Sequence, residues 1–430
     1  MSLDRSPVDT CLTSNPLVHP PRRRFRILML APTGFFADYG CHVRIRGHAR
    51  AVAARGHEVL IVTYPGGRDV PGLTIVRPPG WPRGREMPIG SAWSKIALDA
   101  ILAPVAWEAA RRFRPDIIHA YLHEGALIGA VLARLRRIPL VFDFQGSLTG
   151  EMLDHRFISP RSPFLPLWRR LERWIDVRPA AILASSSHAA ALLTSRFGVP
   201  AARVRPLLDS VDASAFRPAA QQDSAAIARL RLSLGLPPGR PVVVYLGLLA
   251  PYQGIDTLLQ AVALLVGSPK PFFLIMGFPY VARYRRLATE LGITGDVLFT
   301  GAIPYEDAPL YLALGDLAVA PKRSDTEGSG KLLPYMASAL PVVASDLPVH
   351  REYLGDEGCY FPPGDASAFA SSIVAALADR EGALARGRAL RQRVVARFSW
   401  EQAAAQLEEV YQSLTCSGRG ESGHCLPDRM

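Results

Sequence analysis

Short apolar runs alternate with stretches of helical periodicity along most of the chain. The first clear unit spans residues 26–63, where an apolar run, a glycine-bearing loop, a helix-like stretch ending at Gly56 and a second apolar run follow one another. That order is typical of a βαβ unit with parallel strands. Further runs of strand length lie at residues 116–120, 138–143, 181–185, 241–247, 272–277, 297–301, 317–320 and 342–344. The alternation predicts an α/β fold built on doubly wound parallel sheets.

A polar, proline-rich stretch interrupts this alternation between residues 212 and 240 and marks a domain boundary. A chain of 430 residues has room for two or three domains of roughly 100–200 residues each. Because ligands of such sheets bind at the carboxyl ends of the strands, the cleft between two domains is the expected site. We predict a disordered basic tail at 1–24, a first Rossmann-like domain at 25–216, a second at 217–398, a last helix at 399–414 that can cross back, and a disordered tail at 415–430.

The five cysteines are far apart, and none forms a Cys-x-x-Cys pair. This pattern argues against a disulfide framework and a zinc site, and it is typical of free thiols in a reducing cytoplasm. Residues 1–24 lack the apolar core of a secretory signal, and no run of about 18 apolar residues marks a transmembrane helix. We therefore expect a cytoplasmic protein.

The positive net charge is carried by the first half of the chain. Residues 1–218 hold 30 basic residues against 17 acidic ones, whereas the remaining 212 residues hold 19 against 21. An anionic surface facing the first domain explains this asymmetry, either phospholipid head groups or an anionic acceptor. A coding bias toward arginine is the alternative. We expect no nucleic-acid partner, because no basic-aromatic module or helix-turn-helix pattern is present.

Two stretches of the first half mix tryptophan with arginine. They cover residues 81–114 and residues 164–175, and the second has apolar side chains at helical spacing with arginines between them. Basic amphipathic helices with tryptophan can lie in a membrane interface, which would place the protein peripherally on the inner face of the cell membrane. A stripe such as the second is also what a buried core helix carries, so both readings stay open.

Five short motifs, none of them specific alone, follow one another in a fixed order. They are residues 55–59 (RGHEV), 204–212 (VRPLLDSVD), 315–317 (GDL), 335–344 (YMASALPVVA) and 398–400 (FSW). As an ordered set they resemble the retaining glycosyltransferases of group 1, also called family 4, over roughly residues 25–414.

The resemblance implies a GT-B fold, with two Rossmann-like domains facing a cleft. The second domain would hold a nucleotide-diphosphate sugar, and the first would hold a glycan or lipid-linked acceptor. Transfer with retention at the anomeric carbon, no metal and no cofactor are further implications, and no Asp-x-Asp motif occurs in the chain. Polysaccharide or glycolipid biosynthesis is the implied setting.

The segment 327–331 is the candidate donor site. Gly328 and Gly330 allow the backbone to approach a ligand closely, and the following helix N-terminus and Lys331 supply positive charge for a diphosphate. A glycine-rich turn that only caps a helix is the alternative. The resemblance implies that Glu327 lies beside the transferred sugar. The remaining predicted donor-side residues are Gly247, Gln253, Gly277, Lys322, Ser329, Leu332 and Tyr335.

Three positions depart from the family pattern. Leu248 and Gln253 stand where the family tends to carry an arginine and a lysine that hold the diphosphate, and Pro334 stands where a ribose-binding glutamate is usual. Each missing cation is worth roughly 1.5–3 kcal/mol in charge-assisted hydrogen bonds. Lys331, Lys322 or Arg323 could replace them. The open alternatives are a lipid-linked sugar phosphate donor, a catalytically inactive binding or partner protein, and a GT-B sugar-nucleotide epimerase.

The first domain offers candidates for the reaction centre and the acceptor. His123 follows the strand at 116–120, where family members often place a histidine near the reacting sugar, whereas His119 is as readily a core residue. The predicted acceptor-side residues are Gly34, Gly40, Gln145 and Gly146. Gln145 can donate and accept hydrogen bonds but cannot transfer protons.

Overall fold

The computed structural model describes residues 23–38, 40–79, 94–154, 157–267, 269–324 and 328–416. The two predicted disordered tails lie outside these ranges apart from their innermost residues. Glu327 also lies outside them, as does the part of the tryptophan-rich stretch 81–114 that precedes residue 94.

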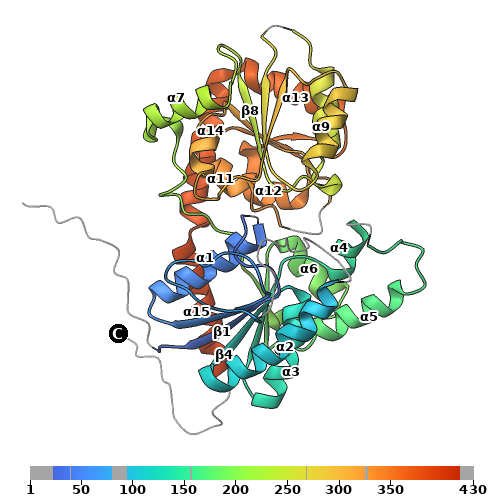
Figure 1. Ribbon diagram of the computed structural model, residues 1–430, viewed down its shortest axis with the longest axis vertical. Coiled ribbons are helices and arrows are strands. Elements are labelled where there is room, and N and C mark those ends of the chain that lie inside the picture. The colour runs from blue at the N-terminus through green and yellow to red at the C-terminus, as the bar shows by residue number, and fades with distance from the viewer. Residues whose placement is uncertain are drawn as a thin grey trace, which may run out of the picture.

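Two parallel sheets, one above the other in Figure 1, form the two halves of the molecule. The first has the order β3-β2-β1-β4-β5-β6-β7 and the second β10-β9-β8-β11-β12-β13. The strands of the first sheet are β1 (Arg26–Ala31), β2 (Glu58–Thr63), β3 (Thr74–Val76), β4 (Ile117–Tyr121), β5 (Leu140–Phe144), β6 (Ala181–Ala184) and β7 (Val204–Pro206). Those of the second are β8 (Val242–Leu246), β9 (Phe272–Met276), β10 (Val297–Gly301), β11 (Leu317–Ala320), β12 (Val342–Ser345) and β13 (Cys359–Phe361). The predicted α/β GT-B fold is thereby confirmed.

Each sheet reverses its winding direction at its first strand. In the first sheet β1 pairs with β2 on one side and with β4 on the other, so Met29 lies between Ile61 and His119. In the second, β8 lies between β9 and β11 in the same way. The crevice outside the carboxyl ends of the strands at such a switch point is where doubly wound sheets bind ligands.

Helices cover both faces of each sheet. Those of the first domain are α1 (Gly40–Ala54), α2 (Ser94–Phe113), α3 (Leu122–Arg136), α4 (Leu148–Asp154), α5 (Leu165–Asp176) and α6 (Ser187–Ser195). The later helices are α7 (Ser224–Ser233), α8 (Ile255–Leu264), α9 (Val281–Glu290), α10 (Ala308–Leu312), α11 (Leu332–Ala337), α12 (Pro348–Leu354), α13 (Ala366–Ala378), α14 (Arg380–Arg397) and α15 (Trp400–Cys416).

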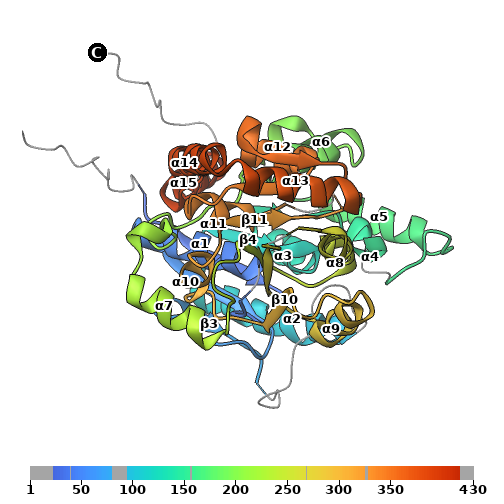
Figure 2. The ribbon, with the colours of Figure 1, turned by 90° about the horizontal axis from the view of Figure 1, so that it is seen from above.

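Alternate side chains of β1 enter two different cores. Leu28 and Leu30 pack with α2 and α3, whereas Ile27 and Met29 pack with α1 and α15. Figure 2 shows α2 and α15 on opposite sides of the molecule. A strand buried on both faces needs apolar residues at every position, which is why β1 reads as a continuous apolar run.

The last helix, α15, lies against the first sheet although it follows the second in sequence (Figure 1). Leu407 and Tyr411 share a core with Ile45 of α1. Glu408 accepts hydrogen bonds from Arg55 at 2.5 Å and pairs with His57 at 2.9 Å. The RGHEV motif is therefore a structural anchor for α15.

Polar contacts also join the two halves at the cleft. Arg46 and Arg68 pair with Glu306 at 2.7 and 3.0 Å, and the backbone N–H of Tyr305 donates to Asp38 at 2.8 Å. These contacts link α1 and the loop after β2 to the segment before α10, and they help to fix the width of the cleft.

Candidate functional site

A cavity of about 290 Å³ lies between the two sheets and takes its walls from both. Its first-domain wall includes Thr33, Gly40, Arg44, Lys95, Gln145, Glu151, Ser185 and Asp209. Its second-domain wall includes Gly247, Leu248, Gln253, Gly277, Gly328, Ser329, Gly330, Lys331 and Pro334. Nine predicted site residues therefore share one cavity, namely Gly40, Gln145, Gly247, Gln253, Gly277, Gly328, Ser329, Gly330 and Lys331.

The turn at residues 328–330 faces the first domain across the cavity. A Cβ added to Gly330 would come within 2.9 Å of Asp209 Oδ2, and one added to Gly328 within 3.2 Å. Ser329 is buried, and its hydroxyl lies 3.0 Å from Nε2 of His350. The contact between Ser329 and His350 therefore holds the turn on its interior side. On the other side, Asp209 leaves no room for a side chain at either glycine.

Lys331 brings the positive charge of the second domain to the cavity wall. Its ammonium donates to the Tyr245 hydroxyl at 3.0 Å and to the Gln253 side-chain carbonyl, and it lies 4.6 Å above the Tyr245 ring. Gln253 stands where the family tends to carry a lysine. It accepts from the ammonium of Lys331 and so positions a cation that comes from another part of the chain.

Lys322, Leu332 and Tyr335 do not line the cavity. Lys322 is fully buried and donates to the carbonyl of Gly328 at 3.1 Å, so it supports the turn from the interior. The hydroxyl of Tyr335 accepts from the N–H of Leu246 at 2.7 Å and ties α11 to β8. These three side chains support the second-domain wall of the cavity.

Pro334 lines the cavity as the third residue of α11, which begins at Leu332. Proline is common at the first position of a helix, where its missing N–H is harmless. The third position is harmless for the same reason, since the first four N–H groups of a helix have no partner within the helix.

His123 lies behind the cavity wall, in the space between α3 and α5. Its Nε2 is 3.4 Å from Asp176 and 3.9 Å from Glu172, and its ring packs edge-on against Phe142 and Phe144. Burial lowers the pKa of His123, but the close contact with Asp176 and the negative charges of Asp176 and Glu172 raise it to about 9. The structure therefore places this histidine beside two carboxylates and outside the cavity lining, and its role at the reaction centre stays a prediction.

Gly34 and Gly146 also lie outside the cavity lining, next to residues that belong to it. Thr33, beside Gly34, hydrogen-bonds to Nε2 of the buried His42, and the N–H of Ala37 donates to Nδ1 of the same ring at 2.6 Å. Burial lowers the pKa of His42 to about 3. The first loop is therefore held by a neutral imidazole.

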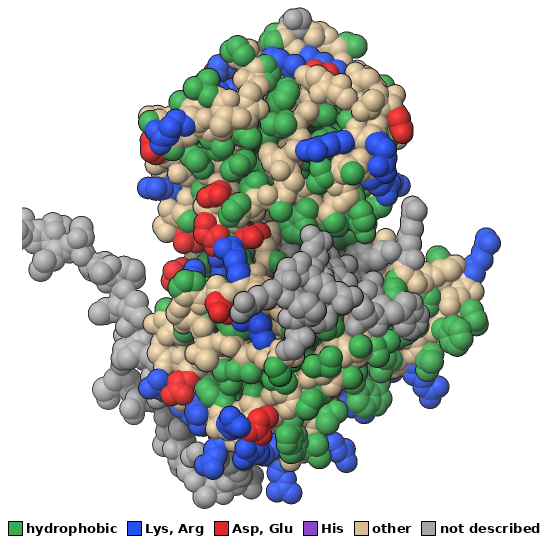
Figure 3. Space-filling view, viewed as in Figure 1, with side chains coloured by type: hydrophobic (Ala, Val, Ile, Leu, Met, Phe, Trp, Pro, Cys, Tyr) green, Lys and Arg blue, Asp and Glu red, His purple; other side chains and the backbone are tan. Residues whose placement is uncertain are grey.

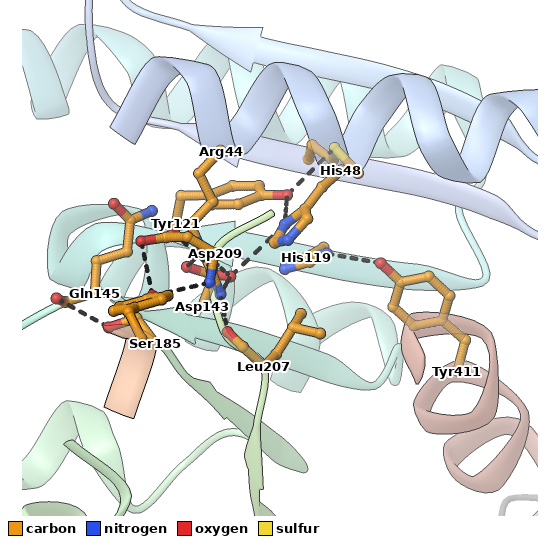
Figure 4. A network of polar contacts seen from close by, with 12 residues as sticks. Arg44, His48, His119, Tyr121, Asp143, Gln145, Ser185, Leu207, Asp209 and Tyr411 are labelled. Atoms are coloured by element: carbon orange, nitrogen blue, oxygen red, sulfur yellow. Dashed lines mark hydrogen bonds and ion pairs between the residues drawn. The ribbon is translucent and has the colours of Figure 1, made fainter. Parts of the chain in front are cut away.

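A buried arginine organises the first-domain wall (Figure 4). Arg44 of α1 pairs with Asp143 at the end of β5 through two parallel hydrogen bonds of 2.9 Å, and its third nitrogen donates to Asp209 at 2.9 Å. It also donates to the carbonyl of Leu207 at 2.8 Å. Asp209 in turn accepts from the hydroxyl of Tyr353 on α12 at 3.3 Å. One guanidinium thus connects helix, sheet, inter-domain segment and second domain.

Two histidines back this arginine. His48 lies 3.1 Å from the Tyr121 hydroxyl, and His119 lies 2.7 Å from the hydroxyl of Tyr411 on α15 (Figure 4). Burial and the charge of Arg44 lower the pKa of His119 to about 3 and that of His48 well below its ordinary value. Both rings are therefore neutral, and His119 is the core residue that the sequence left as an alternative.

The sequence analysis did not single out Arg44, Asp143 or Asp209. A signal for Arg44 was present, because it precedes Ile45 and lies one turn from His48 on the helix face that is otherwise apolar. Asp143 stands at a strand end, which is a usual place for site residues. Their mutual contact depends on tertiary packing and leaves no local pattern.

Two buried clusters in the described part of the chain could offer three ligands to a metal ion. They are His48, His119 and Asp143, and His123, Glu172 and Asp176. In the first cluster, the carboxylate of Asp143 is already paired with Arg44. In the second, the raised pKa of His123 favours a proton over a metal ion at neutral pH. Neither set is a strong candidate, and the expected metal independence stays a prediction.

None of the helices in the described ranges combines the length and the apolar character that crossing a membrane requires.

Comparison with known proteins adds family membership to this geometry. Residues 39–208 match the family "Glycosyl transferase 4-like domain", and residues 240–379 match "Glycosyl transferases group 1". The chain is 26% identical to the sulfoquinovosyl transferase SQD2 of Arabidopsis thaliana over 98% of its own length and 80% of that protein.

A second relative is more similar over a shorter region. It is the GDP-mannose-dependent alpha-(1-6)-phosphatidylinositol monomannoside mannosyltransferase of Mycolicibacterium smegmatis, 32% identical over 60% of this chain and 67% of that protein. Among solved structures, the sucrose-phosphate synthase of Thermosynechococcus elongatus superimposes with a TM-score of 0.77 at 22% identity, covering 91% of this chain and all of that one. The chain therefore belongs to the group 1 glycosyltransferases and is an enzyme of the glycosyltransferase class.

Proposed function

We propose that this enzyme moves a sugar from a nucleotide-diphosphate sugar to a glycan or lipid-linked acceptor, with retention of the anomeric configuration and without a bound metal. The observation that carries the proposal is the turn of Gly328 to Lys331, which presents glycine backbone and one ammonium to the inter-domain cavity. The phosphatidylinositol mannosyltransferase, whose name specifies GDP-mannose and a lipid acceptor, supports both substrate classes.

In this proposal the second domain binds the diphosphate. Lys331 replaces the cations that Leu248 and Gln253 do not supply, and the backbone at Gly328 and Gly330 approaches the phosphate oxygens. A charge-assisted hydrogen bond of this kind is worth roughly 1.5–3 kcal/mol. Glu327 would lie next to the sugar, as the family pattern implies.

Asp209 is proposed to bind a hydroxyl of the transferred sugar. Its carboxylate is about one-sixth exposed, with Oδ1 held by Arg44 and Oδ2 directed at the glycine turn. Because Arg44 keeps the carboxylate oriented, it accepts a hydrogen bond without reorganising when the donor arrives. Gln145 and Lys95, on the same wall, are proposed to contact the acceptor.

The experiment is to incubate the enzyme with a panel of nucleotide sugars and lipid or glycan acceptors, and to read the anomeric configuration of the product by NMR. Transfer with the configuration of the donor supports the proposal, and inversion contradicts it. Conversion of the donor without an acceptor would indicate an epimerase. If the enzyme transfers sugar only from a polyprenyl-phosphate sugar, its donor is a lipid-linked sugar phosphate and not a nucleotide sugar.

A matched pair of variants locates the activity. Lys331→Ala removes the cation that the second domain brings to the cavity, whereas Lys270→Ala removes a lysine that pairs with Asp296 away from the cavity. The proposal requires that only the first variant lose transfer.

A further inference from the structure

Three neighbouring helices of the first domain carry an unusual share of exposed apolar side chains. Of the fifteen large hydrophobic residues that are exposed among the described residues, eight lie on α2, on α3, or on and beside α5. The most exposed are Leu135, Phe164 and Leu167, at 61%, 65% and 64%. Figure 3 shows hydrophobic side chains together with lysine or arginine over this lower part of the molecule. We call the exposed side of these three helices the helix face.

The apolar sector of α5 is wider than the domain can cover. Leu165 and Ile175 are buried, and Ile175 belongs to the core that packs against the first sheet. Leu167 and Trp174 lie on the adjoining side of the same sector and are exposed, with Phe164 just before the helix. At 100° per residue these positions form one continuous apolar arc, half of it inside and half outside. An isolated exposed leucine needs no explanation. An exposed apolar strip that runs along the helix from Phe164 to Trp174 does need one.

Contacts between the helices make the helix face continuous. α3 packs against both α2 and α5. The guanidinium of Arg136 at the end of α3 lies over the ring of Trp107 on α2, and that of Arg178 lies over the ring of Trp174 on α5.

The acidic and basic side chains of α5 lie on different sides of the helix. Its two carboxylates, Glu172 and Asp176, are buried and face His123. The arginines on α5 and just after it are exposed. Neither these arginines nor two at the end of α3 form an ion pair with an acidic side chain in the described part of the chain. They are Arg134, Arg136, Arg169, Arg170, Arg173 and Arg178. The helix face therefore combines apolar surface with unneutralised positive charge.

We propose that the helix face docks the enzyme on the surface of an anionic lipid bilayer. The inference rests on the proposed function in that a membrane-associated acceptor gives the docking its purpose. Leu167, Phe164 and Trp174 would enter the head-group region, and the arginines would bind lipid phosphates around them. A bilayer fits better than a second copy of the chain, because a two-fold contact would bring arginine against arginine.

Vesicle co-sedimentation tests the proposal. The probes are vesicles of phosphatidylcholine alone and of phosphatidylcholine mixed with phosphatidylglycerol. The wild-type protein should bind the anionic vesicles and release them at high salt, and it should ignore the neutral ones. Arg170→Glu/Arg173→Glu and Leu167→Glu/Trp174→Glu should each weaken binding at least about tenfold, since each arginine near an anionic surface is worth about fivefold.

Helix α7 provides the control. Arg229 and Leu232 on it are exposed, with Leu232 at 81%, so Arg229→Glu/Leu232→Glu makes the same chemical change elsewhere and should bind like the wild type. Circular dichroism and nucleotide-sugar binding, measured on every variant, show that the fold and the cavity are intact.

Wild-type protein that fails to sediment with anionic vesicles overturns the proposal, as do helix-face variants that bind like the control. If light scattering shows that Leu167→Glu/Trp174→Glu converts a dimer to a monomer while vesicle binding is unchanged, the face is an interface between copies and the proposal is wrong. Vesicle binding without any donor binding would leave the docking surface standing and would count against the proposed function.

Discussion

At the scale of single residues, the shape of the cavity depends on close contacts between residues on its two facing walls. Gly330 can sit against Asp209 only because it has no side chain, and Asp209 holds its place because Arg44 binds its other oxygen. Lys331 reaches the cavity because Tyr245 and Gln253 both accept from its ammonium. Each of these contacts can be changed on its own.

Gly330→Ala should weaken nucleotide-sugar binding and lower stability by about 1–3 kcal/mol, because the new methyl group would lie 2.9 Å from Asp209 Oδ2 and one of the two must shift. Isothermal titration and denaturant unfolding measure the two effects. Gly295→Ala, whose methyl group would meet nothing within 4 Å, is the control. In an Asp209→Ala background, which lacks the carboxylate, Gly330→Ala should cost less stability than it does in the wild type, and an equal cost would show that the contact is not the cause.

Arg44→Met should destabilise the protein by about 3–5 kcal/mol, because it leaves the buried carboxylate of Asp143 without a partner. Adding Asp143→Asn should restore part of the loss, since the amide carries no charge. Urea unfolding checks this, with the exposed Arg229→Met expected within about 0.5 kcal/mol of the wild type. A loss below about 1 kcal/mol for Arg44→Met would mean that water reaches the network.

At the scale of elements, the sequence predicted the long apolar strands and missed the short edge strands. β1, β9 and β10 are continuous apolar runs and lie within a residue of the predicted positions. β3, β7 and β13 have three residues each, too few to show a period, and they exist because a neighbouring strand pairs with them. The tertiary structure, not local propensity, makes them strands.

The attachment of α5 to α3 should depend on pH. The pKa of His123 is raised from 6.5 to about 9 in the folded protein, so its charge contributes stability that is complete below pH 6.5 and is lost as pH rises through about 9. The raised pKa of Asp176, due to burial, acts in the same direction.

Urea unfolding between pH 6 and 10 measures this effect. The free energy of unfolding should fall across that window by on the order of 3 kcal/mol more in the wild type than in His123→Gln. Parallel pH profiles for the two proteins would show that the imidazolium is not what holds α5.

At the scale of the whole molecule, two features could be predicted from the sequence and one could not. The order of strands and helices indicated two parallel sheets and a cleft at their carboxyl ends, and the glycine turn with Lys331 indicated one wall of it. The opposite wall is built on Arg44, Asp143 and Asp209, which are up to 165 residues apart in the sequence. No local pattern reports a contact of that length, and so these three residues could not be predicted from the sequence.

The proposed function depends above all on whether the turn of Gly328 to Lys331 binds the diphosphate of a nucleotide sugar. Its most direct test is thermal stabilisation of the purified enzyme by a panel of nucleotide sugars, with Lys331→Ala and Lys270→Ala measured beside the wild type. One donor should raise the melting temperature of the wild type and of Lys270→Ala by several degrees, and Lys331→Ala should bind that donor about 10–100-fold more weakly. Equal stabilisation of all three proteins, or of none by any donor, would contradict the proposed function.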